Sequence, residues 1–288
     1  MSTDPIVPLD PNWPKASLAE IRALLTAPGA KFELDTVDIG GVPTKVWKNA
    51  PPTLRILTQL VRAYGPREFT IYDDERVTYE ANYRAVSHLA HRLREMGVGK
   101  GDRVALAMRN LPEWPVIYFA TVSIGAIIVP LNAWWTGGEL EYALNDSGAK
   151  LLFVDGERHA RLAGRYPTGG TLERVIVARA KAPLDGGATA LEALIGAPES
   201  WASMDEVPFP DVAIAPDDDA TIFYTSGTTG APKGALGTHR NFVTNILSSG
   251  YTGARTYLRR GEMPPEPEPK VGLLVIPLFH VTACSATM

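Results

Sequence analysis

The sequence predicts an α/β fold in which parallel strands are covered by helices on both faces. Four short apolar runs carry this prediction: VALAM at 104–108, AIIVPL at 126–131, LLFV at 151–154 and VIVA at 175–178. Near-continuous apolar runs are typical of strands that are buried on both faces, and the helical patterns between them provide the crossovers of a parallel sheet. The 26 glycines and 24 prolines among 288 residues indicate many turns and argue against a helical bundle.

Residues 1–68 are predicted to form an N-terminal extension and lead-in, which proline interrupts repeatedly. A short helix is expected over 17–25, followed by strands within 32–47 that Gly40-Gly41 divides. A second helix is expected over 53–64.

Residues 69–180 are predicted to form a first α/β subdomain. It opens with a hairpin over 69–79, after which Thr78 caps a helix whose apolar residues recur at steps of three and four until Gly97. Pro112 begins the next helix, and Thr136 with Glu139 forms the T-x-x-E capping box of a third. The remaining elements follow in order: strands at 103–108, 126–131, 151–154 and 173–178, and a helix at 157–165.

Residues 181–219 are interpreted as a surface connection, with one short helix at 190–195. The connection ends in the acidic run 217–219, for which a solvated turn is favoured over a metal site. Residues 220–288 then start a second α/β subdomain with a strand at 220–224. The Pro/Glu-rich segment 261–270 is expected to be exposed.

Composition excludes several classes of protein. The net charge of −4 provides no basic excess for a phosphate backbone, so nucleic acid is not an expected partner. A single cysteine, Cys284, cannot form an internal disulfide, fits a reducing compartment and is interpreted as a small packed side chain. The longest apolar stretch, 116–129, is too short to span a bilayer, and no signal peptide is recognised, so a cytoplasmic location is expected.

One motif carries chemistry. After the strand at 220–224 comes TSGTTGAPKG, residues 225–234, with three glycines, four hydroxyls and one lysine. Glycine allows close approach of the backbone, while N–H groups, hydroxyls and a lysine can hold phosphate oxygens. The spacing is not that of a Walker A loop, because Lys233 lies between Pro232 and Gly234. No G-x-G-x-x-G dinucleotide fingerprint follows a strand either.

The string YTSGTTGAPKGA resembles the signature loop of the adenylate-forming enzymes, which include acyl-CoA synthetases, coumarate-CoA ligases, luciferases and peptide-synthetase adenylation domains. The resemblance extends to GVGKGDRVALAMRNLPEW, to GAIIVPLNAWWTGGELEYALNDSGAKLLFVD and to VIPLFHVTA. It implies an ATP-dependent carboxylic acid–CoA ligase for a fatty or aryl acid, with ATP, Mg²⁺ and coenzyme A as cofactors. A carboxylate would attack the α-phosphate to give an acyl-adenylate, and the thiol of coenzyme A would then displace AMP.

The resemblance also implies site residues. Those expected to wrap the β- and γ-phosphates are Thr225, Ser226, Gly227, Thr228, Thr229 and Gly230. Lys233 would add positive charge there, and Thr225 is similar to a position that can ligate Mg²⁺.

Two further stretches follow the loop. His280, within PLFHVT, would close the pocket around the carboxylate and the α-phosphate, whereas a lone histidine at a strand end is more often packed beside the core. Thr238 is expected to cap the next helix, with His239 and Arg240 at the surface of its first turn.

Family members extend further, so the resemblance predicts an N-terminal part that lacks a complete active site and is inactive alone. Exposed sheet edges and apolar surface would favour self-association. Two alternatives to the ligase stay open: a catalytically incomplete nucleotide-binding remnant, and an adenylation domain of the peptide-synthetase or luciferase type.

Overall fold

A computed structural model describes residues 14–166, 170–181, 183–184, 187–225, 230–266 and 268–287. The chain divides into two compact units. Residues 1–50 and 244–273 belong to the first, and residues 51–243 and 274–288 belong to the second.

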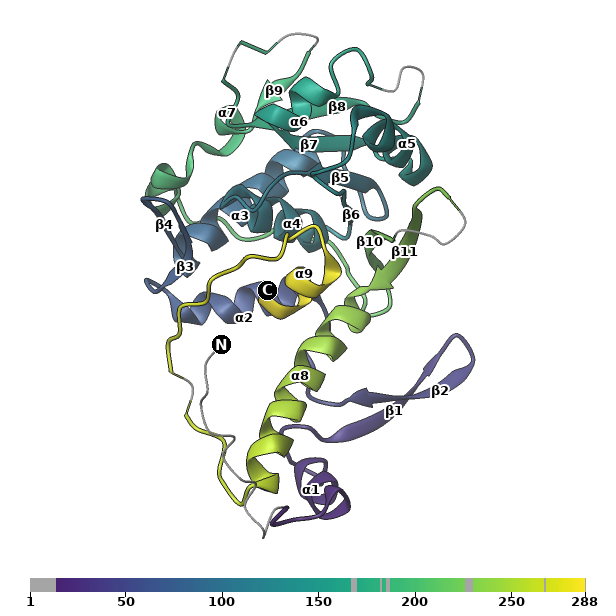
Figure 1. Cartoon of the computed structure of the whole chain (residues 1–288), viewed down its shortest axis with the longest axis vertical. Helices are drawn as coiled ribbons and strands as arrows, with labels where there is room; N and C mark the ends of the chain where they lie inside the picture. Colours follow the sequence, from purple (N-terminus) through teal and green to yellow (C-terminus); the bar gives the residue numbers. More distant parts are fainter. Residues whose placement is uncertain are drawn as a thin grey trace, which may run out of the picture. The chain divides into compact units, whose positions relative to one another are not determined.

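The larger unit is built on a mostly parallel seven-stranded sheet with the order β11-β10-β6-β5-β7-β8-β9 (Figure 1). The strands are β5 (Arg103–Ala107), β6 (Ile127–Pro130), β7 (Leu151–Asp155), β8 (Arg174–Ala178), β9 (Thr189–Ala190), β10 (Asp219–Thr225) and β11 (Lys233–Thr238). Only β11 is antiparallel to its neighbour, β10. The predicted α/β class with a parallel sheet is therefore confirmed.

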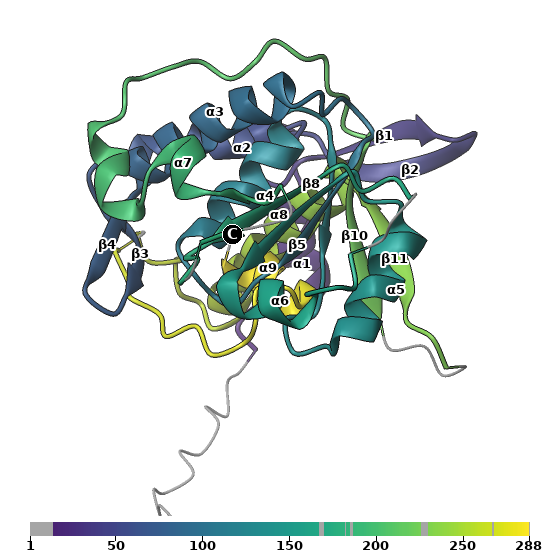
Figure 2. The ribbon, with the colours of Figure 1, turned by 90° about the horizontal axis from the view of Figure 1, so that it is seen from above.

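Helices cover both faces of this sheet (Figure 2). One face is covered by α3 (Tyr79–Glu95) and α4 (Glu113–Ser123), and the other by α5 (Gly137–Ser147) and α6 (Gly156–Arg161). Because side chains alternate along a strand, Ala105, Val129 and Leu152 pack with Leu140 and Leu144 of α5 on one side. The intervening strand residues point to the α3/α4 side, so the strands are buried along nearly their whole length.

Local signals in the sequence set most helix boundaries. Thr78 accepts a hydrogen bond from Ala81 N at the start of α3, and Gly97 follows that helix with φ +82°. Thr136 and Glu139 form the predicted capping box of α5. The hairpin of β3 (Glu68–Tyr72) and β4 (Glu75–Thr78) also lies where the sequence predicts it.

The connection between β9 and β10 runs along α3. It contains α7 (Glu192–Ile195) and η2 (Pro198–Ser203), after which its backbone carbonyls bind α3 side chains. Ser87 Oγ donates to Val207 O, while His88 and His91 contact the carbonyls of Asp205 and Pro208. The helix α2 (Leu54–Val61), followed by η1 (Arg62–Tyr64), lies within the predicted range 53–64, and Thr53 caps it by accepting from Ile56 N.

Two features of β11 and α8 (His239–Arg259) differ from expectation. β11 was not predicted, because its residues are mostly exposed and its strand state depends on pairing with β10 rather than on an apolar pattern. His239, expected at the surface, is fully buried, and its Nδ1 accepts a hydrogen bond from Leu54 N at 3.2 Å. Thr238 does cap α8 through Asn241 N. Arg240 lies partly exposed against Asp217.

The smaller unit contains α1 (Leu18–Leu25), the hairpin of β1 (Leu34–Ile39) and β2 (Val42–Trp47), and most of α8. Its centre is aromatic: Phe32, Trp47 and Tyr251 have ring centroids 5.3–5.8 Å apart. Trp47 Nε1 also donates to Ser248 Oγ at 3.1 Å. The segment 261–270 is exposed at its described residues, as predicted.

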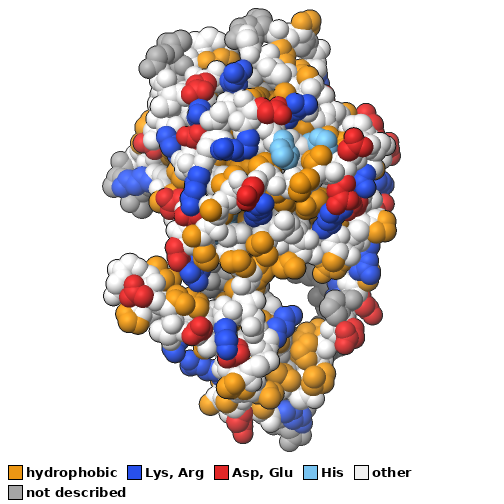
Figure 3. Space-filling model, turned by 180° about the vertical axis from the view of Figure 1, so that it is seen from behind, with side chains coloured by type: hydrophobic (Ala, Val, Ile, Leu, Met, Phe, Trp, Pro, Cys, Tyr) orange, Lys and Arg blue, Asp and Glu red, His pale blue; other side chains and the backbone are white. Residues whose placement is uncertain are grey.

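On the face drawn in Figure 3, basic and acidic side chains are interspersed rather than gathered by sign. Among the described residues, no helix has both the length and the apolar character needed to cross a membrane.

Candidate nucleotide-binding site

The candidate site lies at the carboxyl edge of the sheet. β10, β6, β5 and β7 are neighbours and run parallel, so the loops that follow them start from the same edge. The next two strands in sequence after β5 lie on opposite sides of it: β6 on one side and β7 on the other. The strand order therefore reverses beside β5. Ligands of open α/β sheets bind at such a reversal, outside the carboxyl ends of the strands.

The loop 225–233 connects β10 to β11 at this edge. Thr225 and Lys233 lie opposite each other in the antiparallel pair, with the Thr225 hydroxyl 3.5 Å from the Lys233 carbonyl oxygen. Both residues are exposed, and Gly230 adopts φ +115°, which other residues rarely tolerate. The predicted phosphate ligands Ser226, Gly227, Thr228 and Thr229 lie outside the described residues.

Helix α5 holds the base of this loop. Tyr224 OH donates to Asp146 Oδ2 at 2.6 Å, and the Tyr224 ring packs edge-to-face on Trp135. Burial, reinforced by the neighbouring Asp146 carboxylate, raises the pKa of Tyr224. The Tyr224 phenol therefore stays a hydrogen-bond donor. Its contacts fix the position of Tyr224, directly before Thr225 at the start of the loop.

His280 occupies a turn rather than a strand end. Residues 277–280 form the turn before α9 (Val281–Thr287), and the His280 side chain is exposed, so the alternative of a histidine packed beside the core does not hold. Its Nδ1 accepts a hydrogen bond from Thr282 N at 3.3 Å. A neutral ring that accepts at Nδ1 carries its proton on Nε2, which can donate to a ligand.

Cys284, four residues after His280 and within α9, is buried as predicted. Burial raises the pKa of its thiol to about 12, so the side chain is a packed thiol and not a nucleophile.

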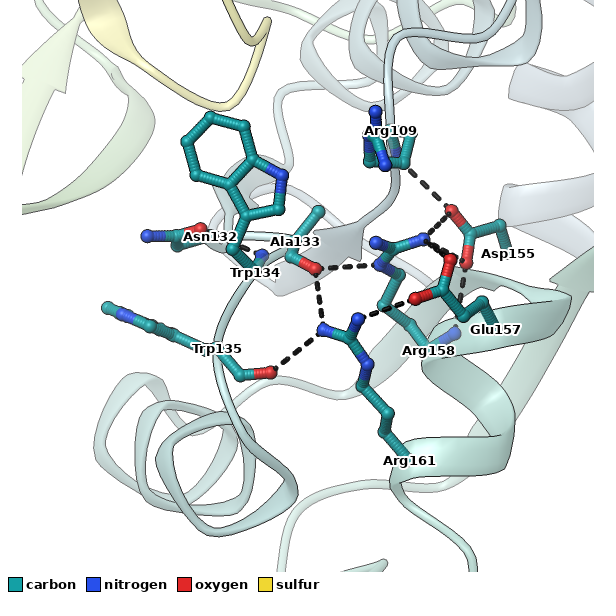
Figure 4. A network of polar contacts seen from close by, with 9 residues as sticks. All are labelled: Arg109, Asn132, Ala133, Trp134, Trp135, Asp155, Glu157, Arg158 and Arg161. Atoms are coloured by element: carbon teal, nitrogen blue, oxygen red, sulfur yellow. Dashed lines mark hydrogen bonds and ion pairs between the residues drawn. The ribbon is translucent and has the colours of Figure 1, made fainter.

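An ion network joins the loops after β5, β6 and β7 (Figure 4). Asp155 accepts from Arg109 N and from Arg158 N, and it pairs with the Arg158 guanidinium at 3.0 Å. Arg158 Nε and Arg161 Nη1 both donate to Ala133 O, at 2.7 and 3.0 Å. Asp155 and the fully buried Arg158 together therefore fix three loops of the carboxyl edge relative to one another.

Three residues of this edge were not singled out in the sequence: Asn110, Trp134 and Arg158. Asn110 follows β5 and bonds to the backbone on both sides of Pro277, while Trp134 follows β6 and packs on Phe279. The sequence signal that could have identified Asn110 and Trp134 is their position just after two apolar strands. Polar and aromatic residues at that position face the ligand edge of a parallel sheet.

The donor set fits a nucleotide phosphate better than a metal held by protein side chains. Within the described ranges, no group of three or more His, Cys, Asp or Glu side chains could hold a metal ion. Of the acidic run, Asp217 pairs with Arg240 and Asp218 with Lys100. Magnesium commonly binds few protein groups and takes phosphate oxygens and waters instead, so one hydroxyl such as Thr225 is compatible with a nucleotide-borne ion.

A parallel α/β sheet with a sequence loop rich in glycine, hydroxyls and lysine at its carboxyl edge is typical of phosphate-binding proteins. Residues 57–288 match the family described as AMP-binding enzyme. Since this match covers most of the chain, the protein belongs to the AMP-binding enzyme family, and the resemblance found in the sequence is confirmed.

Named relatives are CoA ligases. The chain is 30% identical over 240 residues to a crotonobetaine/carnitine–CoA ligase of Salmonella paratyphi A, covering 80% of this chain and 42% of the relative. It is 34% identical over 203 residues to the long-chain-fatty-acid–CoA ligase FadD15 of Mycobacterium bovis, covering 67% and 30%. It is 34% identical over 207 residues to a feruloyl-CoA synthase of an Amycolatopsis species, covering 72% and 35%. The chain thus spans less than half the length of these relatives.

Solved structures show the same fold. The N-terminal domain of FACL13 from Mycobacterium tuberculosis aligns with a TM-score of 0.61 at 21% identity, covering 82% of this chain and 54% of that one. A long-chain-fatty-acid–CoA ligase, FadD1, from Archaeoglobus fulgidus aligns with a TM-score of 0.61 at 23% identity, covering 83% and 45%.

Proposed function

We propose that this chain provides the phosphate-binding part of an ATP-dependent carboxylic acid–CoA ligase. The observation that carries the proposal is the family match over 57–288, together with the loop 225–233 starting at the sheet's carboxyl edge. A carboxylate attacks the α-phosphate of ATP, which gives an acyl-adenylate and releases pyrophosphate. The thiol of coenzyme A then attacks the acyl carbon and displaces AMP.

The role of Lys233 follows from charge. Negative charge grows on pyrophosphate as it leaves, so a cation beside it stabilises the transition state more than the ground state. Lys233 is exposed at the end of the loop and forms no ion pair with any described residue. Its ammonium acts as a point charge on phosphate oxygens and needs no particular fork geometry.

The hydroxyl of Thr225 is the proposed protein ligand for a magnesium ion that arrives with ATP. When bound, the ion would neutralise phosphate charge.

His280 is proposed to close the pocket around the carboxylate and the α-phosphate, donating from Nε2. The relatives named for long-chain fatty acids and for ferulate support a fatty or aryl acid as substrate class. A cytoplasmic location fits these substrates.

The test is acid-dependent exchange of labelled pyrophosphate into ATP by this chain continued after Met288 with the C-terminal part of a homologous CoA ligase, with Lys233→Ala and Lys233→Arg as variants. Lys233→Ala should slow exchange by roughly 30- to 1,000-fold, equivalent to about 2–4 kcal/mol, with a smaller change in the KM for ATP. Lys233→Arg should recover part of the rate. Equal rates for wild type and Lys233→Ala would refute the phosphate-clamp role of this loop.

The same assay separates the alternatives. Exchange followed by transfer to coenzyme A indicates the ligase. Exchange without transfer indicates an adenylation domain. Binding of a fluorescent ATP analogue that depends on Lys233, without any exchange, indicates a nucleotide-binding unit that is not a complete enzyme.

A further inference from the structure

We infer that Asn110 is a positioning residue that fixes where His280 lies at the edge of the sheet. The inference rests on the proposed function, because it gives His280 a task in that site. Asn110 lies three residues beyond the end of β5, and the His280 turn is 170 residues away in sequence. Nothing in the local sequence of residues 274–280 determines which strand the turn lies on.

The Asn110 carboxamide uses both of its ends on this turn. Its Nδ2 donates to Ile276 O at 3.0 Å, and its Oδ1 accepts from Leu278 N at 2.8 Å. The two bonds bracket Pro277, which has no N–H of its own. The backbone at 276–278 belongs to no strand. The Asn110 side chain therefore provides the two hydrogen bonds that a neighbouring strand would otherwise make with it.

Side-chain packing completes the attachment on either side of His280. Phe279 is buried and packs edge-to-face on Trp134, with ring centroids 5.2 Å apart. Cys284 is buried beside Tyr118 of α4. His280 itself, between these two anchors, stays exposed. The arrangement holds the backbone of the turn and leaves the imidazole accessible.

The position matters because β5 is separated from β10 only by β6. Neighbouring strands lie about 4.8 Å apart, so the ends of β5 and β10 are about 10 Å apart. A turn fixed over β5 therefore holds His280 at the same edge of the sheet as the start of the loop 225–233. Without the clamp, the exposed segment 271–276 would let the turn move away from that loop.

Hydrogen exchange tests the clamp without any ligand. Asn110→Ala should raise amide exchange across 278–284 by roughly 10- to 100-fold, as expected for the loss of two hydrogen bonds in a locally opening segment, while amides of β5, β6 and β7 stay protected. Asn110→Asp has the same shape but no donor, so it should lose protection as well. Asn145→Ala is the matched control, because within the described part of the chain the Asn145 side chain bonds only to Glu141 O in its own helix. Exchange within threefold of wild type in both Asn110 variants would overturn the clamp.

A double-mutant cycle in pyrophosphate exchange tests the link to His280. If Asn110 acts through His280, Asn110→Ala should lower kcat and leave the KM for ATP within about twofold, and it should add nothing to His280→Ala. Additive losses would show that Asn110 acts elsewhere. If Lys233→Ala exchanges as fast as the wild type in the continued chain, the proposed function fails, and the hydrogen-exchange result still decides whether the clamp exists.

Discussion

Acidification should destabilise the fold through His239 before the carboxylates titrate. The ring is fully buried where α8 begins, and its Nδ1 accepts the Leu54 N–H. Burial lowers the pKa of His239 from 6.5 to about 4, with Asp218 raising it and Lys100 lowering it. Protonation would remove the acceptor and place a charge in the core, so the folded chain favours the neutral ring.

The magnitude follows from linkage. The unfolded chain binds the proton near pH 6.5 and the folded chain near pH 4, so the stabilisation is present above pH 6.5 and is lost as the pH falls towards 4. The free energy of unfolding should therefore fall by about 2 kcal/mol between pH 7 and pH 5, and by about 3 kcal/mol in total.

The assay is urea unfolding at pH 7 and pH 5, with His239→Asn as the test variant. Asparagine Oδ1 can still accept from Leu54 N but does not titrate, so this variant should lose the pH-dependent difference. His91→Gln is the control, because it changes a histidine on α3 and keeps His239; it should retain the wild-type slope. If wild type and His239→Asn fall equally in stability from pH 7 to pH 5, the reasoning about His239 is wrong.

Three further substitutions probe single contacts by the same unfolding measurement. Tyr224→Phe removes the donor to Asp146 and should cost about 1–2 kcal/mol, whereas no change would mean that water replaces this bond. Glu113→Ala removes the buried one of the two carboxylates that bind the Arg179 guanidinium, while Glu75 still pairs with it, so the change should cost about 2 kcal/mol, with Glu113→Gln costing less. Thr136→Ala removes the cap of α5 and should cost about 1 kcal/mol, while Thr136→Ser should be nearly neutral.

The site could be predicted only as far as local sequence signals reach. Thr225, Gly230 and Lys233 were placed in a loop after a strand because glycine, hydroxyls and lysine gather there, and the structure puts the root of that loop at the carboxyl edge. The clamp by Asn110 was not predictable in this way. Its two hydrogen bonds join residues 166 and 168 positions apart, and no pattern within either segment announces the other.

His239 and β11 show the same limit from the opposite side. A histidine in the first turn of a polar helix has the local pattern of a surface residue, and only the packing of α2 on that turn buries it. A strand reading KGALGT has no apolar alternation, and only the hydrogen bonds of β10 make it a strand.

The sequence by itself determined the α/β class, because apolar runs long enough to be buried on both faces leave few other folds, and it determined the helix ends, because caps such as Thr78 and Thr136 act within four residues. Tertiary structure alone decided that β10 lies beside β6, that Arg158 ties three loops together, and that the His280 turn lies over β5. Those facts depend on contacts between distant segments, whose energies exist only once the chain has folded.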